Sequence, residues 1–267
     1  MTQLSNVASA ADKVEGHPVL QNGARAGYAL NGLLHLMIAW IALQIAWTAS
    51  GKSADQSGAL QTLAGSGLGR LALWVAVLGF LALGLWQLAS AVAVRTRGKS
   101  SHWADKVKGI SKAVVYLALA WTSFSFAKGQ SSSSKAQSAD FTATLLQHPG
   151  GRLLVAVIGL VIIGIGVYHV VKGWTKKFLT DLSENPGMLA TRAGVVGYIA
   201  KGIALALVGV LFVTASLQNS ASKATGLDGA LRSLRQQAFG PWLLTAVGLG
   251  IAAYGLYSFA RARHARV

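Results

Sequence analysis

Acidic residues are scarce in this chain, and cysteine is absent. Only 12% of the 267 residues are charged, whereas about a quarter are charged in an average soluble domain. Without cysteine the chain has no disulfide, no thiolate metal site and no cysteine nucleophile. Since 53% of the residues are hydrophobic, the composition indicates a membrane protein rather than a soluble one.

The eight carboxylates all lie outside the long apolar runs. Paired-acid catalysis within a membrane therefore has no candidate residues. No phosphate-binding glycine motif, HExxH sequence or nucleophile elbow occurs in a context that would support it. We therefore expect a protein that is not an enzyme, with no cofactor and no metal.

Basic residues outnumber acidic ones and give a formal net charge of +16. In a soluble protein this excess would suggest nucleic acid as a partner, but no nucleic-acid-binding motif accompanies it. In a membrane protein the same excess is expected in loops that face the cytoplasm and anionic headgroups. The sequence therefore predicts anionic membrane lipids, and no nucleic acid, as partners.

Six apolar segments are long enough to cross a bilayer, which takes about 20 residues of helix. Four of them contain no charged residue, and two more reach spanning length only by including one lysine each, Lys112 or Lys201. The residues before the first segment are small and polar, which predicts a mobile cytoplasmic N-terminal tail over 1–26 and a membrane domain over 27–267. The six segments are 27–48, 71–94, 109–127, 153–171, 195–217 and 242–260.

Lysine and arginine are distributed unevenly between the two sets of connections. Fourteen lie in the tails and connections on one side, and eight lie in the longer loops of the other side. Because basic loops stay in the cytoplasm, both termini of this multi-pass membrane protein are expected there. An even number of spans agrees with that placement.

A three-fold internal repeat runs through the chain, over about 25–98, 106–177 and 191–264. Each unit contains a basic start, an odd-numbered span, a polar loop with an aspartate, a short leucine-bearing segment, and an even-numbered span with a glycine two residues before an aromatic residue. The alignment makes Asn31, Lys112 and Lys201 equivalent, about one turn inside the cytoplasmic end of each odd span. It also matches three loop aspartates and three span glycines: Asp55, Asp140 and Asp228, and Gly84, Gly166 and Gly255.

The segments after the matched aspartates have leucines three or four residues apart, which predicts short amphipathic helices at the outer interface. A carboxylate near a helix start can accept hydrogen bonds from the free amides there. Each aspartate is therefore expected to act as a helix cap, and ion binding by a ring of three aspartates is the alternative.

Two stretches of the third repeat, GALRSLRQQAFGPWLL from Gly229 and GYIAKG from Gly197, resemble the domain-of-unknown-function 1206 family of bacterial membrane proteins. The resemblance covers three tandem two-helix units over 25–264. It implies three repeats of two transmembrane helices in a bacterial plasma membrane, with no established biochemical activity. The first repeat departs from the pattern by having Asn31 where the other two have lysine.

Lys112 and Lys201 are the candidate site residues that matter most, because a charge within a span is costly. Their long stems could simply reach the headgroups. The sharper hypothesis is an anion or phospholipid-headgroup site, in which helix N-termini also favour negative charge; a substrate or ion path is the third. The candidate site comprises Asn31, Lys112, Lys201, Arg25, Lys108 and Arg192.

His35 and His169 are the two histidines within the spans. A proton relay or a haem ligand would use histidine in this way. However, the repeat alignment places them in different structural positions, and neither belongs to a paired motif. We therefore expect hydrogen-bonded packing residues.

The fold expected from these patterns is an all-α integral membrane protein of six transmembrane helices, built as three parallel helical-hairpin repeats with pseudo-three-fold symmetry. If the central axis is packed, the protein is a scaffold that binds a partner or anionic lipid. If the axis is hydrated, it is a small ion or solute channel or transporter. A membrane-protein partner or a homo-oligomer is compatible with either.

Overall fold

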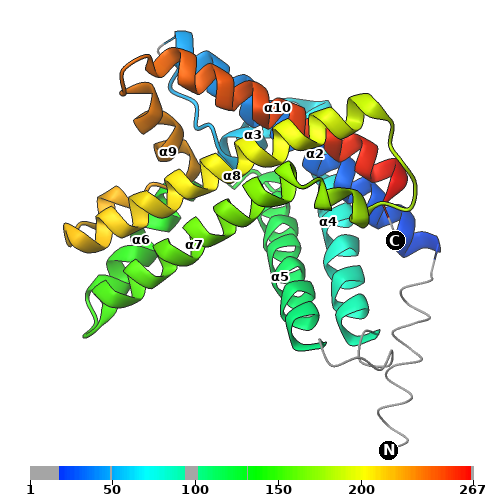
Figure 1. The fold of residues 1–267 in the computed structure, drawn as a ribbon, viewed down its shortest axis with the longest axis horizontal. Coiled ribbons are helices and arrows are strands. Elements are labelled where there is room, and N and C mark those ends of the chain that lie inside the picture. The colour runs from blue at the N-terminus through cyan, green and yellow to red at the C-terminus, as the bar shows by residue number, and fades with distance from the viewer. Residues whose placement is uncertain (1–17, 49, 94–101, 131, 266–267) are drawn as a thin grey trace, which may run out of the picture.

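The computed structural model describes residues 18–48, 50–93, 102–130 and 132–265, and within these ranges the elements are helices (Figure 1). Six helices in the described residues are long and apolar enough to cross a membrane, so the chain is a multi-pass membrane protein. The six are α2 (Pro18–Trp47), α4 (Gly67–Ala93), α5 (His102–Ala127), α7 (Gly151–Trp174), α8 (Met188–Leu217) and α10 (Gly240–His264). The shorter elements are α3 (Gln56–Ala64), α6 (Ser134–Leu146), α9 (Gly226–Arg235) and the 3₁₀ turns η2 (Lys177–Asp181) and η3 (Ala221–Lys223).

Helix α2 begins nine residues earlier than the sequence predicts. Residues 18–26, assigned to the tail, are helical, and 1–17 lie outside the described residues. Proline is tolerated in the first turn of a helix because its missing N–H would be unpaired there anyway. This part of α2 packs through small residues rather than through an apolar stripe. Ala24 is fully buried, and a Cβ on Gly23 would lie 2.6 Å from that of Ala82 in α4.

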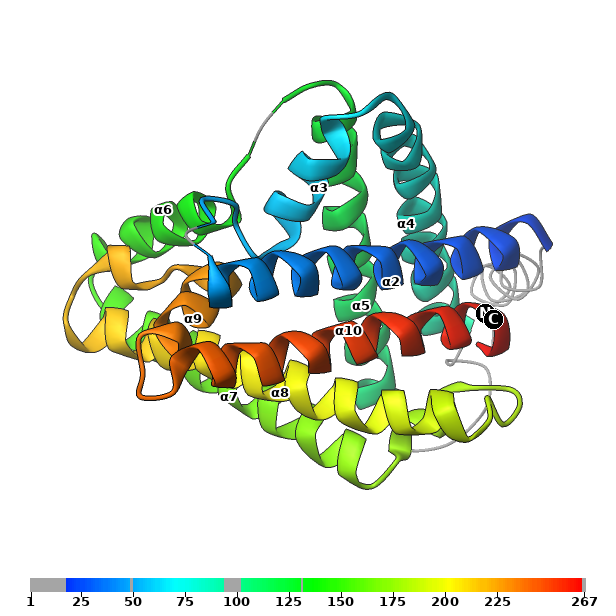
Figure 2. The same cartoon turned by 90° about the horizontal axis from the view of Figure 1, so that it is seen from above.

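The closest helix pairs join neighbouring repeats rather than the two helices of one repeat. Helix α4 packs on α5, α7 on α8, and α10 on α2, so the last helix closes back onto the first (Figure 2). Within repeats, α2 contacts α4 and α8 contacts α10, but among the described residues α5 and α7 do not pack closely. The six helices therefore form a ring that is open between α5 and α7.

The repeat-equivalent glycines form the crossing point in each close pair. Gly166 of α7 lies against Gly202 of α8, where a Cβ on Gly166 would be 2.7 Å from the Gly202 carbonyl oxygen. Gly255 of α10 meets Gly32 of α2 in the same way, at 2.9 Å. Such small residues allow helix backbones to approach closely. In the pair α4–α5 the third glycine, Gly84, meets the Leu117 side chain instead.

Two of the three interfaces, α7–α8 and α10–α2, are therefore locally equivalent, but the repeats are not arranged alike. Both views show α4 and α5 running at a steep angle to the other long helices (Figures 1 and 2). A pseudo-three-fold axis through the whole domain stays a prediction.

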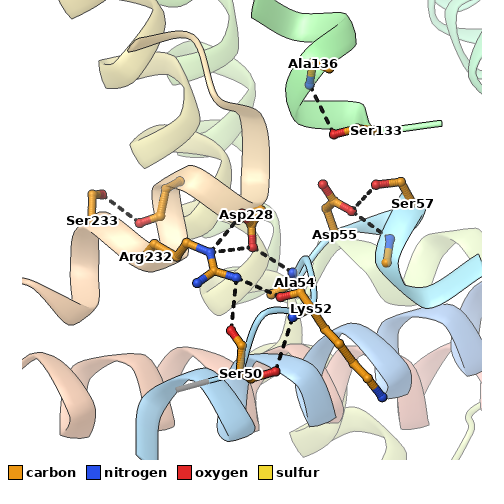
Figure 3. Close-up of polar contacts among 12 residues, drawn as sticks. Ser50, Lys52, Ala54, Asp55, Ser57, Ser133, Ala136, Asp228, Arg232 and Ser233 are labelled. Carbon is orange, nitrogen blue, oxygen red and sulfur yellow. Dashed lines mark hydrogen bonds and ion pairs between the residues drawn. The ribbon is translucent and has the colours of Figure 1, made fainter. Parts of the chain in front are cut away.

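The three matched loop aspartates have three different environments. Asp55 caps α3, accepting from the Gly58 N–H at 3.0 Å, as predicted. Asp228 lies in the first turn of α9, where it accepts instead from the Ala54 N–H at 2.8 Å and pairs with Arg232 (Figure 3). Asp140 lies inside α6 and is exposed. The cap role is therefore wrong for Asp140 and Asp228.

The pair of Asp228 and Arg232 connects the first repeat to the third. Arg232 also donates to the backbone carbonyls of Lys52 at 2.8 Å and Ser50 at 3.4 Å, both in the loop after α2 (Figure 3). A buried carboxylate is stabilised by such charge-assisted bonds. Asp228 therefore accepts from an amide of the loop after α2 instead of from the amides of its own helix. The repeat pattern alone does not predict this contact between repeats.

Candidate functional site: a cationic cluster beside aromatic rings

The connection from α7 to α8 is fixed by a buried aromatic cluster. Phe178, in η2, is fully buried and stacks on Tyr198 of α8 with 5.1 Å between ring centroids. Tyr257 of α10 packs edge-on to Phe178, and its hydroxyl donates to the Phe178 carbonyl oxygen at 3.3 Å. Because Phe178 is held by two helices, Asp181 three residues later is held against the ends of α7 and α10.

The Asp181 carboxylate contacts cations from two repeats. Lys172 Nζ lies 2.6 Å from Asp181 Oδ2, and Arg261 Nη2 lies 4.0 Å from the same oxygen. Lys112 of α5 is close enough to Asp181 and Arg261 for the charges to interact. We call Lys112, Lys172, Arg261 and Asp181 the cationic cluster, and the end of the membrane domain that contains it the cationic end.

Lys172 and Arg261 occupy the same position in the second and third repeats, six residues after the matched glycine. Each places its cation over a tyrosine of the helix that it packs against. Lys172 Nζ lies 5.4 Å from the ring centroid of Tyr198 in α8, and the Arg261 guanidinium carbon lies 4.4 Å from that of Tyr28 in α2. Such contacts contribute about 0.5–2 kcal/mol each. The corresponding residues of the first interface are Ser90 and Gly109.

The cationic cluster has more hydrogen-bond donors than acceptors. Among the described residues, the buried Arg261 Nε has no hydrogen-bond partner, while Nη2 donates to the Tyr28 hydroxyl at 3.4 Å and lies 4.0 Å from the Asp181 carboxylate. Lys112 makes no hydrogen bond or ion pair with the described residues. Since three cations act on one carboxylate and only two of them pair with it, the cluster can accept a further anion without losing an internal bond.

Electrostatics in the cluster favour the charged form of its one acid. Burial alone would raise the pKa of the Asp181 carboxyl, but the charges of Arg261 and Lys172, with the hydrogen bond from Lys172, outweigh burial and hold that pKa below its usual value. Asp181 is therefore ionised at neutral pH, and the cluster keeps a net positive charge.

The structure separates the residues predicted for the anion site. Arg25, Lys108 and Arg192 have exposed side chains, while Asn31, Lys112 and Lys201 are half-buried. Of the six, Lys112 belongs to the cationic cluster, and Lys108 lies close enough to interact with it. The Asn31 carbonyl oxygen bonds the ring of His35 at 2.7 Å.

Lys201 lies in a second environment, over an aromatic ring. Its Nζ is 4.2 Å from the Tyr254 ring centroid, and its charge is close enough to act on both His35 and His169. The two histidines thus approach the same lysine from different helices, although the repeat places them in different positions. Each ring nitrogen Nδ1 bonds a carbonyl four residues earlier in its own helix, at 2.7 and 2.8 Å.

Lys172, Asp181 and Arg261 were not singled out by the sequence reasoning. For Lys172 and Arg261 the repeat alignment could have indicated a shared role, because it matches Lys172 to Arg261 and Tyr28 to Tyr198. Asp181 gave no such signal, because it lies in a connection outside the repeated unit. In the described part of the chain, no three residues among histidine and the acids converge in a way that could hold a metal ion.

Comparison with known proteins bears on the whole chain. A family model described as Domain of Unknown Function (DUF1206) matches three times, at residues 26–93, 107–176 and 196–265. The uncharacterized protein YxxB of Bacillus subtilis (strain 168) is 27% identical over 253 residues, which cover 92% of this chain and 91% of that protein. No solved structure matches. Since the three matches fall on the three two-helix repeats and cover most of the sequence, the chain belongs to the DUF1206 family.

Proposed function

We propose that this protein is a non-catalytic membrane scaffold that binds an anionic ligand at the cationic end. One observation carries the proposal: the charges of three cations, from α5, α7 and α10, act on a single carboxylate, and within the described part of the chain the buried Arg261 Nε has no hydrogen-bond partner. The ligand chemistry is a phosphate or carboxylate, borne either by a lipid headgroup or by a free anion.

The cluster suits such a group for two reasons. Arginine offers a planar fork of N–H donors that fits phosphate and carboxylate oxygens, and lysine adds a compact point charge. Partial burial also lowers the effective dielectric constant, so each charge acts more strongly than it would in water. Anionic lipids, which concentrate on the cytoplasmic leaflet, supply the matching charge.

Native mass spectrometry of the purified protein tests the site. We expect the wild type to retain an anionic lipid, and Lys112→Ala to bind it roughly tenfold more weakly, because one charge-assisted contact is worth about 1.5 kcal/mol or more. Lys112→Ala with Lys201→Ala should show at least the same loss. Lys135→Ala, an exposed residue of α6 at the opposite end, is the matched control. Equal retention by all variants would remove the proposal.

The orientation proposed with this function places the cationic end and both termini in the cytoplasm of a bacterium. The absence of cysteine allows a direct test. In intact cells, a membrane-impermeant thiol reagent should label Lys135→Cys, whereas Arg263→Cys, an exposed residue near the end of α10, should react only after permeabilisation. The opposite labelling pattern would reverse the assignment.

A further inference from the structure

The ring of helices is open at one place, and the cationic cluster lies beside that opening. We infer that the anionic ligand is a membrane lipid, whose headgroup binds the cationic cluster and whose acyl chains lie along the open faces of α5 and α7. This inference rests on the proposed anion site and adds the identity of its ligand.

The second repeat differs from the other two in its packing. The two spans of the first and third repeats contact each other, but α5 and α7 do not, and Figure 1 shows them running in different directions. These two spans are also the least buried of the six. In an apolar stretch of 18 residues from each helix, 28% is buried in α5 and 17% in α7, against 39–50% in the other four. Hydrocarbon must therefore cover these two helices more than any other pair.

Both helices bring a cation toward the same point. Lys112 comes from α5 and Lys172 from α7, and both charges act on Asp181. Lys108, one turn before Lys112, has an exposed side chain and adds to the positive charge on α5. The opening is thus marked with positive charge at one end, as an anionic headgroup requires.

Apolar side chains continue from each cation along its own helix. On α7, residues at about one, two and three turns from Lys172 are Tyr168, Ile165 and Val161, which are 48%, 44% and 55% exposed. On α5, Val115 lies three residues beyond Lys112 and is 56% exposed. A molecule with a charged head and an apolar tail fits this succession, whereas a free anion would use only the head.

The length of the stripe on α7 matches one leaflet. Val161 and Lys172 are eleven residues apart, which is about 16 Å of helix axis at 1.5 Å per residue. One leaflet contributes half of a hydrocarbon core that is about 30 Å thick. A headgroup at Lys172 therefore places its acyl chain beside Ile165 and Val161.

Photocrosslinking locates the chains and the headgroup separately. The full-length protein is reconstituted with phosphatidylglycerol that carries a diazirine on one acyl chain, irradiated, digested and mapped by mass spectrometry. We expect adducts on α5 around 114–118 and on α7 around 161–168, at least fivefold above those on α4 around Leu78, although Leu78 is more exposed than the residues of these two stripes. Phosphatidylcholine with the same diazirine, which has no net charge, should lose this preference.

Three variants separate the possible failures. Ile165→Trp should fill the stripe and lower the α5 and α7 adducts, while Leu78→Trp should leave them unchanged; Lys112→Ala should lower them together with lipid retention. Adducts spread evenly over α4, α5, α7 and α10 while Lys112→Ala still lowers retention would overturn the lipid inference and leave the anion site intact. If inorganic phosphate displaces the label completely at millimolar concentration, the ligand is a free anion. Retention unaffected by Lys112→Ala would remove the anion site itself.

Discussion

Replacing Asp181 with asparagine is expected to lower the free energy of unfolding by about 3 kcal/mol. The carboxylate is the acidic partner that Lys172 and Arg261 share, and the three side chains are only 9–19% exposed. Removing one partner of a buried ion pair costs about 3–5 kcal/mol, because the remaining charges stay desolvated; partial exposure places the expected value at the lower end. Unfolding in mixed micelles measures the effect, with the exposed Asp140→Asn as the control.

The same variant predicts a pH dependence. The folded pKa of Asp181 is lower than its unfolded value, so the stability that it provides is fully present above the unfolded pKa of about 4 and is lost as pH falls through the folded pKa. The stability difference between wild type and Asp181→Asn should therefore be constant from about pH 7 to pH 5 and shrink below about pH 4. A difference that grew on acidification would contradict the ionised state of Asp181.

Asp181→Asn should have the opposite effect on ligand binding. Its carboxylate is itself an anion at the cationic cluster, so neutralising it raises the net positive charge there by one. We expect the folded variant to bind anionic lipid several-fold more tightly than the wild type, whereas Lys112→Ala binds more weakly. Opposite changes from two substitutions in one cluster would separate an electrostatic binding site from a general loss of structure.

Gly166→Ala is expected to disrupt the packing of α7 on α8. The added Cβ would lie 2.7 Å from the Gly202 carbonyl oxygen and 2.8 Å from the Ala206 nitrogen, which are backbone atoms of α8 and cannot rotate away. Overpacking of this kind costs about 1–3 kcal/mol. We expect a fall of about 3 kcal/mol in the free energy of unfolding, or loss of the folded protein from membranes.

Gly164 provides a control in the same helix. A Cβ at this position meets no atom within 4 Å, so Gly164→Ala should change stability by less than about 0.5 kcal/mol. Because the α10–α2 interface has the same glycine-to-glycine contact as α7–α8, Gly255→Ala should behave like Gly166→Ala. If Gly164→Ala and Gly166→Ala were equally tolerated, the close approach of α7 and α8 would be wrong.

Much of the fold could be predicted because the bilayer imposes a simple requirement on sequence. A span of about 20 apolar residues can be recognised without its neighbours, and the repeat added the short helices and the equivalence of the glycines. The beginning of α2 was missed because its packing depends on small residues such as Gly23 and Ala24, which have no apolar periodicity. Pairing between repeats could not be predicted, because a repeat pattern does not say which copy an element packs against.

Less of the candidate site could be predicted. Lys112 was identified because a lysine within an apolar run is unusual in any context. Asp181 could not be, since its place depends on Phe178 being buried between α8 and α10, a tertiary contact. The predicted cap at Asp228 is wrong for a similar reason, because Asp228 bonds a loop of another repeat. The predicted cap at Asp140 is wrong because α6 begins earlier, at Ser134, and is capped by Ser133.

Calorimetric titration with a short-chain anionic phospholipid, below its micellar concentration, tests the proposed anion site most directly. The wild type and Lys135→Ala are expected to bind with equal affinity, Lys112→Ala roughly tenfold more weakly, and Asp181→Asn more tightly. The matching zwitterionic lipid should bind weakly to all four proteins. Equal affinities of the four proteins for the anionic lipid would contradict the assignment of the cationic cluster as a binding site.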